Sequence, residues 1–165
     1  MLFRTLLSLT LFLLLLSTGI VVATETLAPG DKLPETRLCD QHGEPHNLTK
    51  ARLILFAPDK AAGELIHEVL RDKTQTELDR QGIVVISDIS RMPGLITRFI
   101  ALPAMRDYSY RMLLGQDEEE TQWLPRQEGA VTQLIVQNGQ IRELDYLPSA
   151  EELKRLMAPN NADRL

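Results

Sequence analysis

The chain has 165 residues, a net charge of −5 and a single cysteine, Cys39. This length predicts one domain, which can bury a core without disulfide bonds. An acidic chain without a basic cluster is a poor candidate for binding nucleic acid or anionic membrane surfaces. One cysteine also excludes an internal disulfide.

The N-terminus has the pattern of an export signal. Arg4 precedes an apolar run, Leu6–Val22, and Ala23 ends a small-residue cleavage site. We therefore expect a signal peptide over residues 1–23, a mature chain that begins at Thr24, and a periplasmic location. The alternative is an uncleaved anchor, because the run is long enough to span a bilayer, which takes roughly 17–25 residues. In that case this segment would be the membrane contact of the chain.

The first half of the mature chain predicts a hairpin followed by a β-α-β unit. Thr36–Asp40 and Pro45–Leu48 flank a turn-forming stretch. Arg52–Phe56 and Ile83–Ile86 are apolar runs typical of buried strands. Between them, Ala61–Arg80 has the periodicity of a helix.

The second half predicts a further helix, a strand, a hairpin and a terminal helix. Gly94–Met105 has helical spacing, with Leu95, Ile96, Phe99 and Ile100 apolar, and Pro103 should end or bend it. Tyr110–Leu114 is a short strand before an acidic loop, Asp117–Glu120.

The chain ends with two strong local signals. Asn138-Gly139 between two β-type runs is the strongest short-range signal for a hairpin. Ser149 and Glu152 then form a capping box that opens the last helix. This element order predicts an α/β fold: a central mixed β-sheet flanked by helices, with an N-terminal β-hairpin extension. It covers residues 24–160, and residues 161–165 form a flexible tail.

Several segments resemble the thioredoxin-like superfamily, in particular peroxiredoxins of the AhpC/TSA type and thiol–disulfide reductases. The resemblance is carried by Ala28–Pro34, by Asp40-Gln41-His42-Gly43, by Tyr110–Leu114 and by Val131–Ile141. The signal and the stretch Ile89–Pro93 resemble the periplasmic YtfJ-type branch.

The resemblance implies a thiol site that this chain lacks. Family members place a reactive cysteine at the start of the helix after the first core strand, where the helix N-terminus lowers its pKa. Here Pro58 is kept, but Ala62 stands in place of a threonine and Leu65 in place of the peroxidatic cysteine. The family's proline before the final hairpin is replaced by Ala130 or Val131. We therefore expect a redox-inactive protein with a binding or accessory role.

An enzyme is the alternative. It would be a thiol oxidoreductase or peroxidase that uses Cys39 with an external thiol. Alternation along Thr36–Asp40 places Cys39 on the face opposite Leu38. We expect it to be a half-buried strand residue, away from the active-site end of the sheet.

The candidate binding rim consists of four charged residues that follow the two core strands, Asp59, Lys60, Asp88 and Arg91, with Pro58 shaping the turn. Ligands of open α/β sheets bind beyond the carboxyl ends of the strands. A partner protein or a small acidic ligand would fit such a rim. A solvated edge with helix-capping acids explains the same residues, and is the simpler interpretation.

We expect no metal and no cofactor. Cys39, His42 and His46 supply only three ligands where structural zinc takes four. The chain has neither a dinucleotide-binding glycine motif nor a Walker motif.

Overall fold

The computed structural model describes residues 26–158. The predicted signal peptide, its cleavage site and the predicted tail over 161–165 all lie outside this range. Within 26–158, no helix is both long enough and apolar enough to cross a membrane.

A seven-stranded mixed sheet forms the centre of the molecule, in the order β2-β1-β5-β4-β3-β6-β7. Three strands, β3, β4 and β5, are parallel, and the two hairpins extend the sheet with antiparallel strands on either side. The mixed sheet and both hairpins are therefore confirmed. The strands are β1 (Arg37–Asp40), β2 (Pro45–Asn47), β3 (Leu53–Ala57), β4 (Ile83–Asp88), β5 (Met112–Gly115), β6 (Val131–Gln137) and β7 (Gln140–Leu147).

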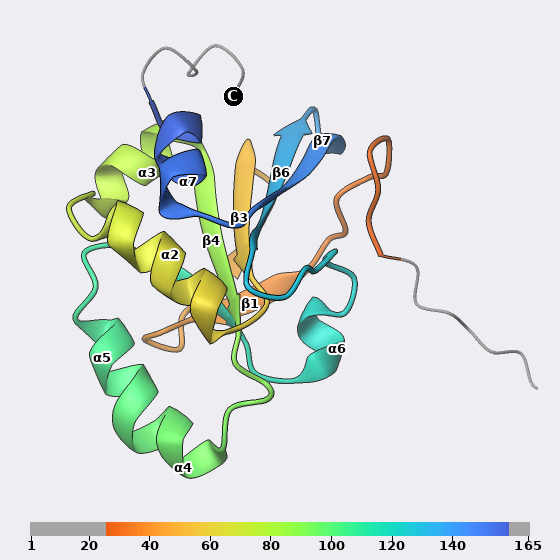
Figure 1. Ribbon diagram of the computed structural model, residues 1–165. Coiled ribbons are helices and arrows are strands. Elements are labelled where there is room, and N and C mark those ends of the chain that lie inside the picture. The colour runs from red at the N-terminus through yellow and green to blue at the C-terminus, as the bar shows by residue number, and fades with distance from the viewer. Residues whose placement is uncertain (1–25, 159–165) are drawn as a thin grey trace, which may run out of the picture.

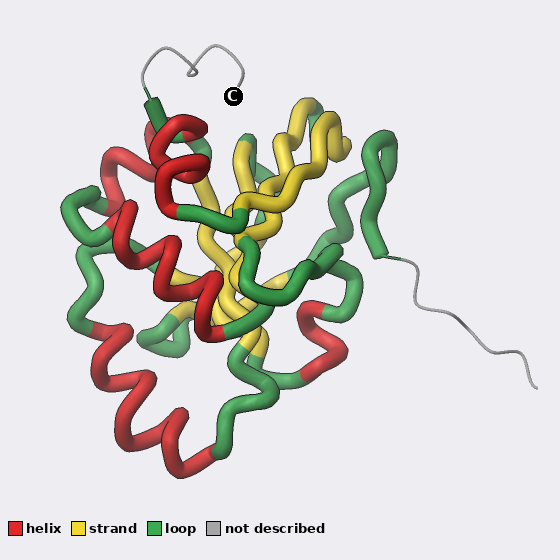
Figure 2. The backbone as a smooth tube through the Cα atoms, in the orientation of Figure 1, coloured by secondary structure: helices red, strands yellow, loops and turns green. Residues whose placement is uncertain are grey.

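Helices lie on both sides of this sheet, with most of them on one side (Figure 1; Figure 2). The helical segments are α2 (Lys60–Leu70), α3 (Gln75–Gln81), α4 (Gly94–Ile96), the π-helix η2 (Thr97–Ala101), α5 (Leu102–Arg106), α6 (Glu118–Thr121) and α7 (Ala150–Leu156). On the first face, α2, α3 and α7 bury apolar side chains such as Ile66, Leu78 and Leu153. On the second face, Leu124 is buried and Leu27 and Trp123 pack at its margin.

The predicted helix over Ala61–Arg80 is wrong in its continuity, since the segment forms α2 and α3 with a break between them. Thr74 has an extended backbone and caps α3, with its side chain on the backbone N–H of Glu77. The Glu77 side chain in turn accepts from the backbone N–H of Thr74 at 2.7 Å. This reciprocal capping box starts a new helix, which periodicity alone does not reveal.

Two further expectations need correction. Pro103 does not end the helix, because it occupies the first turn of α5 after a π-turn in which the N–H of Leu102 bonds to the carbonyl of Thr97. Proline is tolerated in the first turn of a helix, and a single π-turn changes the hydrogen-bond pattern of a helix locally. The acidic loop Asp117–Glu120 contributes to α6, which Asp117 and Glu120 cap reciprocally.

The final hairpin has the turn predicted for it. Asn138 and Gly139 have φ of 54° and 74°, the left-handed pair that a two-residue hairpin turn requires and that Asn-Gly adopts readily. The hairpin places β6 next to β3. The loop that precedes β6 is thereby brought to the end of the core strands.

Candidate functional site

The carboxyl ends of β3 and β4 lie side by side. Ala57 is in register with Ser87 in the parallel pair, and Asp88 is in register with Gly115 of β5. Residues 58–60 and 88–91 therefore leave the same edge of the sheet, as the sequence predicts. The structure shows, however, that the charged residues of this rim differ in what they do.

Asp59 holds two segments of the rim together. It is the N-cap of α2, with an extended backbone, and its Oδ1 accepts from the N–H of Ala62 at 3.0 Å. Its Oδ2 accepts from the N–H of Gly129 at 2.8 Å. Gly129 lies in the loop before β6 and has a φ of 71°, a conformation that favours glycine. Both oxygens of Asp59 are thus used within the fold.

Asp88 is part of a buried network at the end of β4. Its side chain is 2% exposed and pairs with Arg126 at 2.9 Å. It also accepts from the hydroxyl and N–H of Ser90, at 2.6 and 2.9 Å, and from the hydroxyl of Thr121 at 3.1 Å. Burial alone would raise the pKa of Asp88, but these hydrogen bonds outweigh it and hold the pKa below its ordinary value.

Arg126 is the rim residue that sequence reasoning missed. Its second guanidinium nitrogen donates to the carbonyl of Thr121 at 2.9 Å, and its guanidinium lies 5.4 Å from the centre of the Phe56 ring. Arg126 therefore ties the ends of β3 and β4 to α6 and to the loop before β6. Asp88 and Arg126 are far apart in the sequence, and no motif links them.

Two cations of the rim remain on the surface. Lys60 is exposed and pairs with Glu64, one helical turn away at 3.3 Å. Arg91 is exposed. Pro58 is half-buried between β3 and α2. The rim thus consists of two acids engaged in the fold and two cations in solvent.

Apolar side chains lie at and around the position that the resemblance assigns to the reactive cysteine. Ala57 and Ala62 are fully buried, and Leu65 is half-buried against the core of the first face. Ala130 and Val131, the two candidates for the position of the family's proline, are also fully buried. The peptide bonds of residues 26–158 include no cis bond.

Cys39 lies at the level of this rim, and the expectation that it sits away from that end is wrong. It is half-buried on β1, in register with Leu114 of β5, which is itself in register with Ser87 of β4. Two strands, β5 and β4, still separate β1 from β3. Three strand spacings place Cys39 about 14 Å from β3, too far for the N-terminus of α2 to stabilise a thiolate.

The two histidines near Cys39 have different surroundings. His42 is exposed in the turn, where its N–H donates to Asp40 at 2.8 Å. His46 lies 2.9 Å from the other carboxylate oxygen of Asp40. Among residues 26–158, no group of three His, Cys, Asp or Glu side chains is arranged to hold a metal ion.

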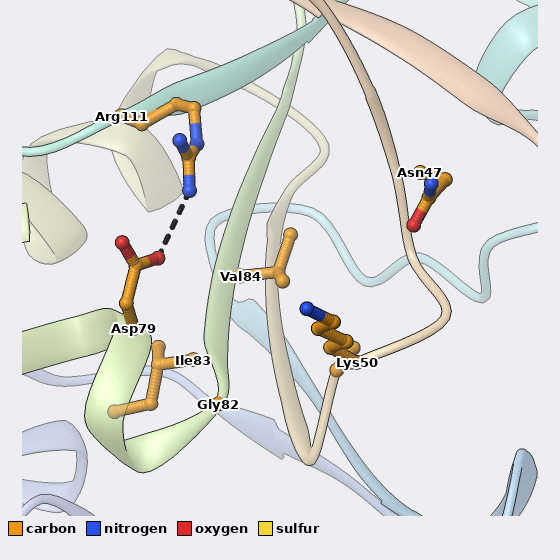
Figure 3. Close-up of a pocket in the computed structure, with 8 residues that line it drawn as sticks. Asn47, Lys50, Asp79, Gly82, Ile83, Val84 and Arg111 are labelled. Carbon is orange, nitrogen blue, oxygen red and sulfur yellow. Dashed lines mark hydrogen bonds and ion pairs between the residues drawn. The ribbon is translucent and has the colours of Figure 1, made fainter.

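A hollow of about 400 Å³ lies at the opposite edge of the sheet, where β4 begins (Figure 3). Arg111 and Asp79 form an ion pair of 2.9 Å on its wall, and Lys50 lies across from them. Ligands of parallel sheets bind at the carboxyl ends of strands, whereas this hollow is at the amino ends. The Arg111–Asp79 pair ties α3 to the start of β5.

Solved structures of several thioredoxin-like proteins resemble this chain. A peroxidoxin, BcpB, from Mycobacterium tuberculosis aligns with a TM-score of 0.55 at 13% identity, covering 84% of this chain and 98% of that one. A putative protein disulfide isomerase from Bacteroides thetaiotaomicron gives 0.54 at 12% identity, covering 79% and 86%. A putative thiol:disulfide interchange protein, DsbE, from Chlorobium tepidum gives 0.51 at 13%, covering 80% and 98%.

No protein-family model matches the sequence, and no curated protein matches it. At identities this low, the likeness establishes the fold and not the activity. The chain therefore has a thioredoxin-like α/β fold, as predicted. Its place in the YtfJ-type branch stays a prediction.

Proposed function

We propose that the protein is an exported thioredoxin-like protein that does no thiol chemistry and serves a binding or accessory role. One observation carries this proposal. Asp59 bridges the start of α2 to Gly129, and so joins the two segments between which a thiol site of this scaffold would lie. The surrounding positions carry Ala57, Ala62 and Leu65 rather than a nucleophile.

The geometry around Cys39 supports the same conclusion. A catalytic thiol needs a helix N-terminus, a cation or a base near its sulfur to form a thiolate at neutral pH. The nearest strand neighbours of Cys39 are Leu114 and Pro45, and neither supplies one. An enzyme that works through Cys39 is the competing function, and its support is that the thiol is half-exposed at the level of the rim.

A peroxide-consumption assay separates the two functions. The wild-type chain and Cys39→Ser would be given hydrogen peroxide and an external dithiol. We expect both to consume peroxide at the rate of the dithiol alone. Turnover that the substitution abolishes would overturn the proposal in favour of a thiol peroxidase. A disulfide-reduction assay with the same pair of proteins tests the oxidoreductase reading.

Export is tested separately. We expect cell fractionation to recover the protein from the periplasm, with Thr24 at or next to its N-terminus. Full-length chain found only in the membrane fraction would show that the N-terminal segment is an anchor and not a cleaved signal peptide.

The rim cations Lys60 and Arg91 are the proposed contacts for a partner protein or an acidic ligand. Their joint replacement by alanine should weaken that contact while leaving the fold intact.

A further inference from the structure

The segment that joins β4 to β5 forms a helical arm over residues 94–106, made of α4, η2 and α5. None of its residues is buried. Leu102 and Met105 are half-buried and pack against the core of the first face. Figure 1 shows α4 at the periphery, well away from the sheet.

Four large apolar side chains of this arm face solvent. Leu95, Ile96, Phe99 and Ile100 are 75%, 43%, 66% and 65% exposed. Within residues 26–158 these are the exposed large hydrophobic residues. Their spacing of one, four and five residues puts them on one side of a helix. Four exposed apolar side chains on one side of a helix form a candidate interaction surface, which we call the apolar patch.

The charged side chains between residues 89 and 106 are all positive, and the acidic residues Asp88 and Asp107 lie just outside this stretch. From Ile89 to Arg106 the sequence contains three arginines and no acidic residue, although the whole chain has a net charge of −5. Arg91 and Arg98 are exposed, and the Arg98 guanidinium lies 5.6 Å from the centre of the Phe99 ring. Arg106 donates to the carbonyl of Gln41 at 3.0 Å and anchors the end of the arm to the β1–β2 turn.

We propose that this arm binds the surface of a lipid bilayer that contains anionic phospholipids. Leu95, Ile96, Phe99 and Ile100 would enter the boundary between headgroups and acyl chains, with Arg91 and Arg98 at the level of the headgroup phosphates. Helices that bind membranes in this way have an apolar face flanked by basic side chains. The net negative charge of the chain does not prevent this, because charges beyond about 8–10 Å are screened at physiological salt.

The backbone of the arm suits this environment. The N–H of Thr97 donates to the carbonyl of Pro93 and the N–H of Leu102 to the carbonyl of Thr97, and the Thr97 hydroxyl is directed at the carbonyls of Met92 and Pro93 at 3.4 and 3.3 Å. Polar groups satisfied internally cost little to bring into an apolar boundary, whereas unsatisfied ones are expensive.

A second copy of the chain fits the patch less well. A symmetric interface through this arm would bring Arg91 and Arg98 of both copies together, and such like charges oppose association. Four exposed side chains also offer only a few hundred Å², below the roughly 800 Å² per partner of a stable protein interface. A bilayer needs no matching shape, since each apolar side chain gains free energy from insertion on its own.

Vesicle flotation tests this proposal. The chain that begins at Thr24 is used, because it contains the whole described fold and lacks the apolar run Leu6–Val22, which would bind any bilayer. Circular dichroism would first show that each protein is folded. One set of vesicles contains phosphatidylglycerol and phosphatidylethanolamine in equal parts, and the other contains phosphatidylcholine alone.

Three variants accompany the wild type. Leu95→Ser with Phe99→Ser removes apolar contacts, and Arg91→Gln with Arg98→Gln removes local positive charge. Arg80→Gln with Arg142→Gln is the matched control, because it changes net charge equally at two exposed arginines outside the arm. We expect the wild type and the control to float with the phosphatidylglycerol vesicles. Each arm variant should bind about tenfold more weakly or worse, and so should the wild type on phosphatidylcholine.

Other outcomes overturn the proposal. Wild-type protein that stays at the bottom of the gradient with both kinds of vesicle would do so, as would equal binding by the Leu95→Ser, Phe99→Ser variant. Analytical ultracentrifugation of the same samples tests the alternative that a second copy of the chain covers the arm. A dimer that this variant abolishes, without vesicle binding by the wild type, would assign the arm to a second copy of the chain.

Discussion

The carboxylate of Asp59 accepts a hydrogen bond from the backbone N–H of Gly129 at 2.8 Å, across 70 residues of sequence. The same carboxylate caps α2 through the N–H of Ala62. Asp59 thus joins the first core helix to the loop that leads into the final hairpin. Its neighbour Lys60 is exposed and pairs with Glu64 of its own helix. The two residues therefore have different roles, although both are charged and follow the same strand.

We predict that Asp59→Ala destabilises the fold by about 2–3 kcal/mol, because it removes a helix cap and leaves the N–H of Gly129 without its acceptor. Lys60→Ala is the matched control and should change the free energy of unfolding by about 0.5 kcal/mol or less. Urea denaturation at neutral pH measures both. Equal losses for the two variants would show that the bridge adds nothing to stability.

The ion pair between Asp88 and Arg126 supports a second prediction. Arg126→Ala leaves the carboxylate of Asp88, which is 2% exposed, without its cation. The expected cost is about 2–4 kcal/mol, below that of a fully orphaned charge because Ser90 and Thr121 still donate to Asp88. The stability of Arg126→Lys should fall between those of the wild type and Arg126→Ala, since lysine cannot bond Asp88 and the carbonyl of Thr121 in the same fork geometry.

Arg91→Ala serves as the control for this change. It removes an arginine of the same rim that is exposed to solvent, and should shift the unfolding midpoint very little. If Arg126→Ala is as mild as Arg91→Ala, the buried network does not hold the end of β4 in place.

Local sequence signals predicted the strands and turns of this fold well. The Asn138-Gly139 turn, the opening hairpin and the buried runs of β3 and β4 each carry their information within a few residues. Where a prediction failed, a contact that hydrophobic periodicity does not reveal decided the structure. The break between α2 and α3 depends on the Thr74–Glu77 capping box, which lies inside a run of otherwise helical periodicity.

The rim and the arm show a different limit. Sequence order places Asp88 after β4, but Arg126 reaches it from 38 residues away, and a single sequence carries no sign of such a pairing. Helical spacing groups Leu95 and Phe99 on one face, yet the same spacing describes a face that packs inward or one that points to solvent. Only the tertiary structure shows that this face is exposed.

Acid should destabilise the protein through Asp40 and Asp88. Burial alone would raise the pKa of Asp40, but hydrogen bonds from Glu44, His46 and His42 outweigh it and lower the pKa, as the network does for Asp88. A folded-state pKa below that of the unfolded chain gives stability that is present above about pH 3.9 and lost as pH falls through the folded pKa.

Urea midpoints between about pH 2.5 and 7 measure this loss. Asp40→Asn with Asp88→Asn should be less stable than wild type at pH 7 and should lose less on acidification. Asp72→Asn with Asp145→Asn removes two exposed carboxylates instead and should keep the acid loss of the wild type. A double Asp40, Asp88 variant whose midpoint falls as steeply as that of the wild type would contradict this account.

Cys39 should remain a free thiol. It is the only cysteine of the chain, so any disulfide must join two molecules, and the half-buried strand position restricts access to its sulfur. We expect a monomer on a non-reducing gel of protein taken directly from cells, with the thiols blocked at lysis. A dominant dimer that reducing agent dissolves, and that Cys39→Ser lacks, would show that the thiol is reactive.

Two glycines of this fold should respond oppositely to alanine. A Cβ at Gly115 would collide with Cγ2 of Thr121, whose hydroxyl supports Asp88, whereas a Cβ at Gly63 in α2 would meet open space. Gly115→Ala should therefore cost about 1–3 kcal/mol through overpacking, and Gly63→Ala should add about 0.5–1 kcal/mol because alanine favours the helix. Thr121→Ser removes the colliding methyl group but keeps the hydroxyl, so the double variant with Gly115→Ala should recover part of the loss. A double variant that is no more stable than Gly115→Ala alone would place the strain elsewhere than between β5 and α6.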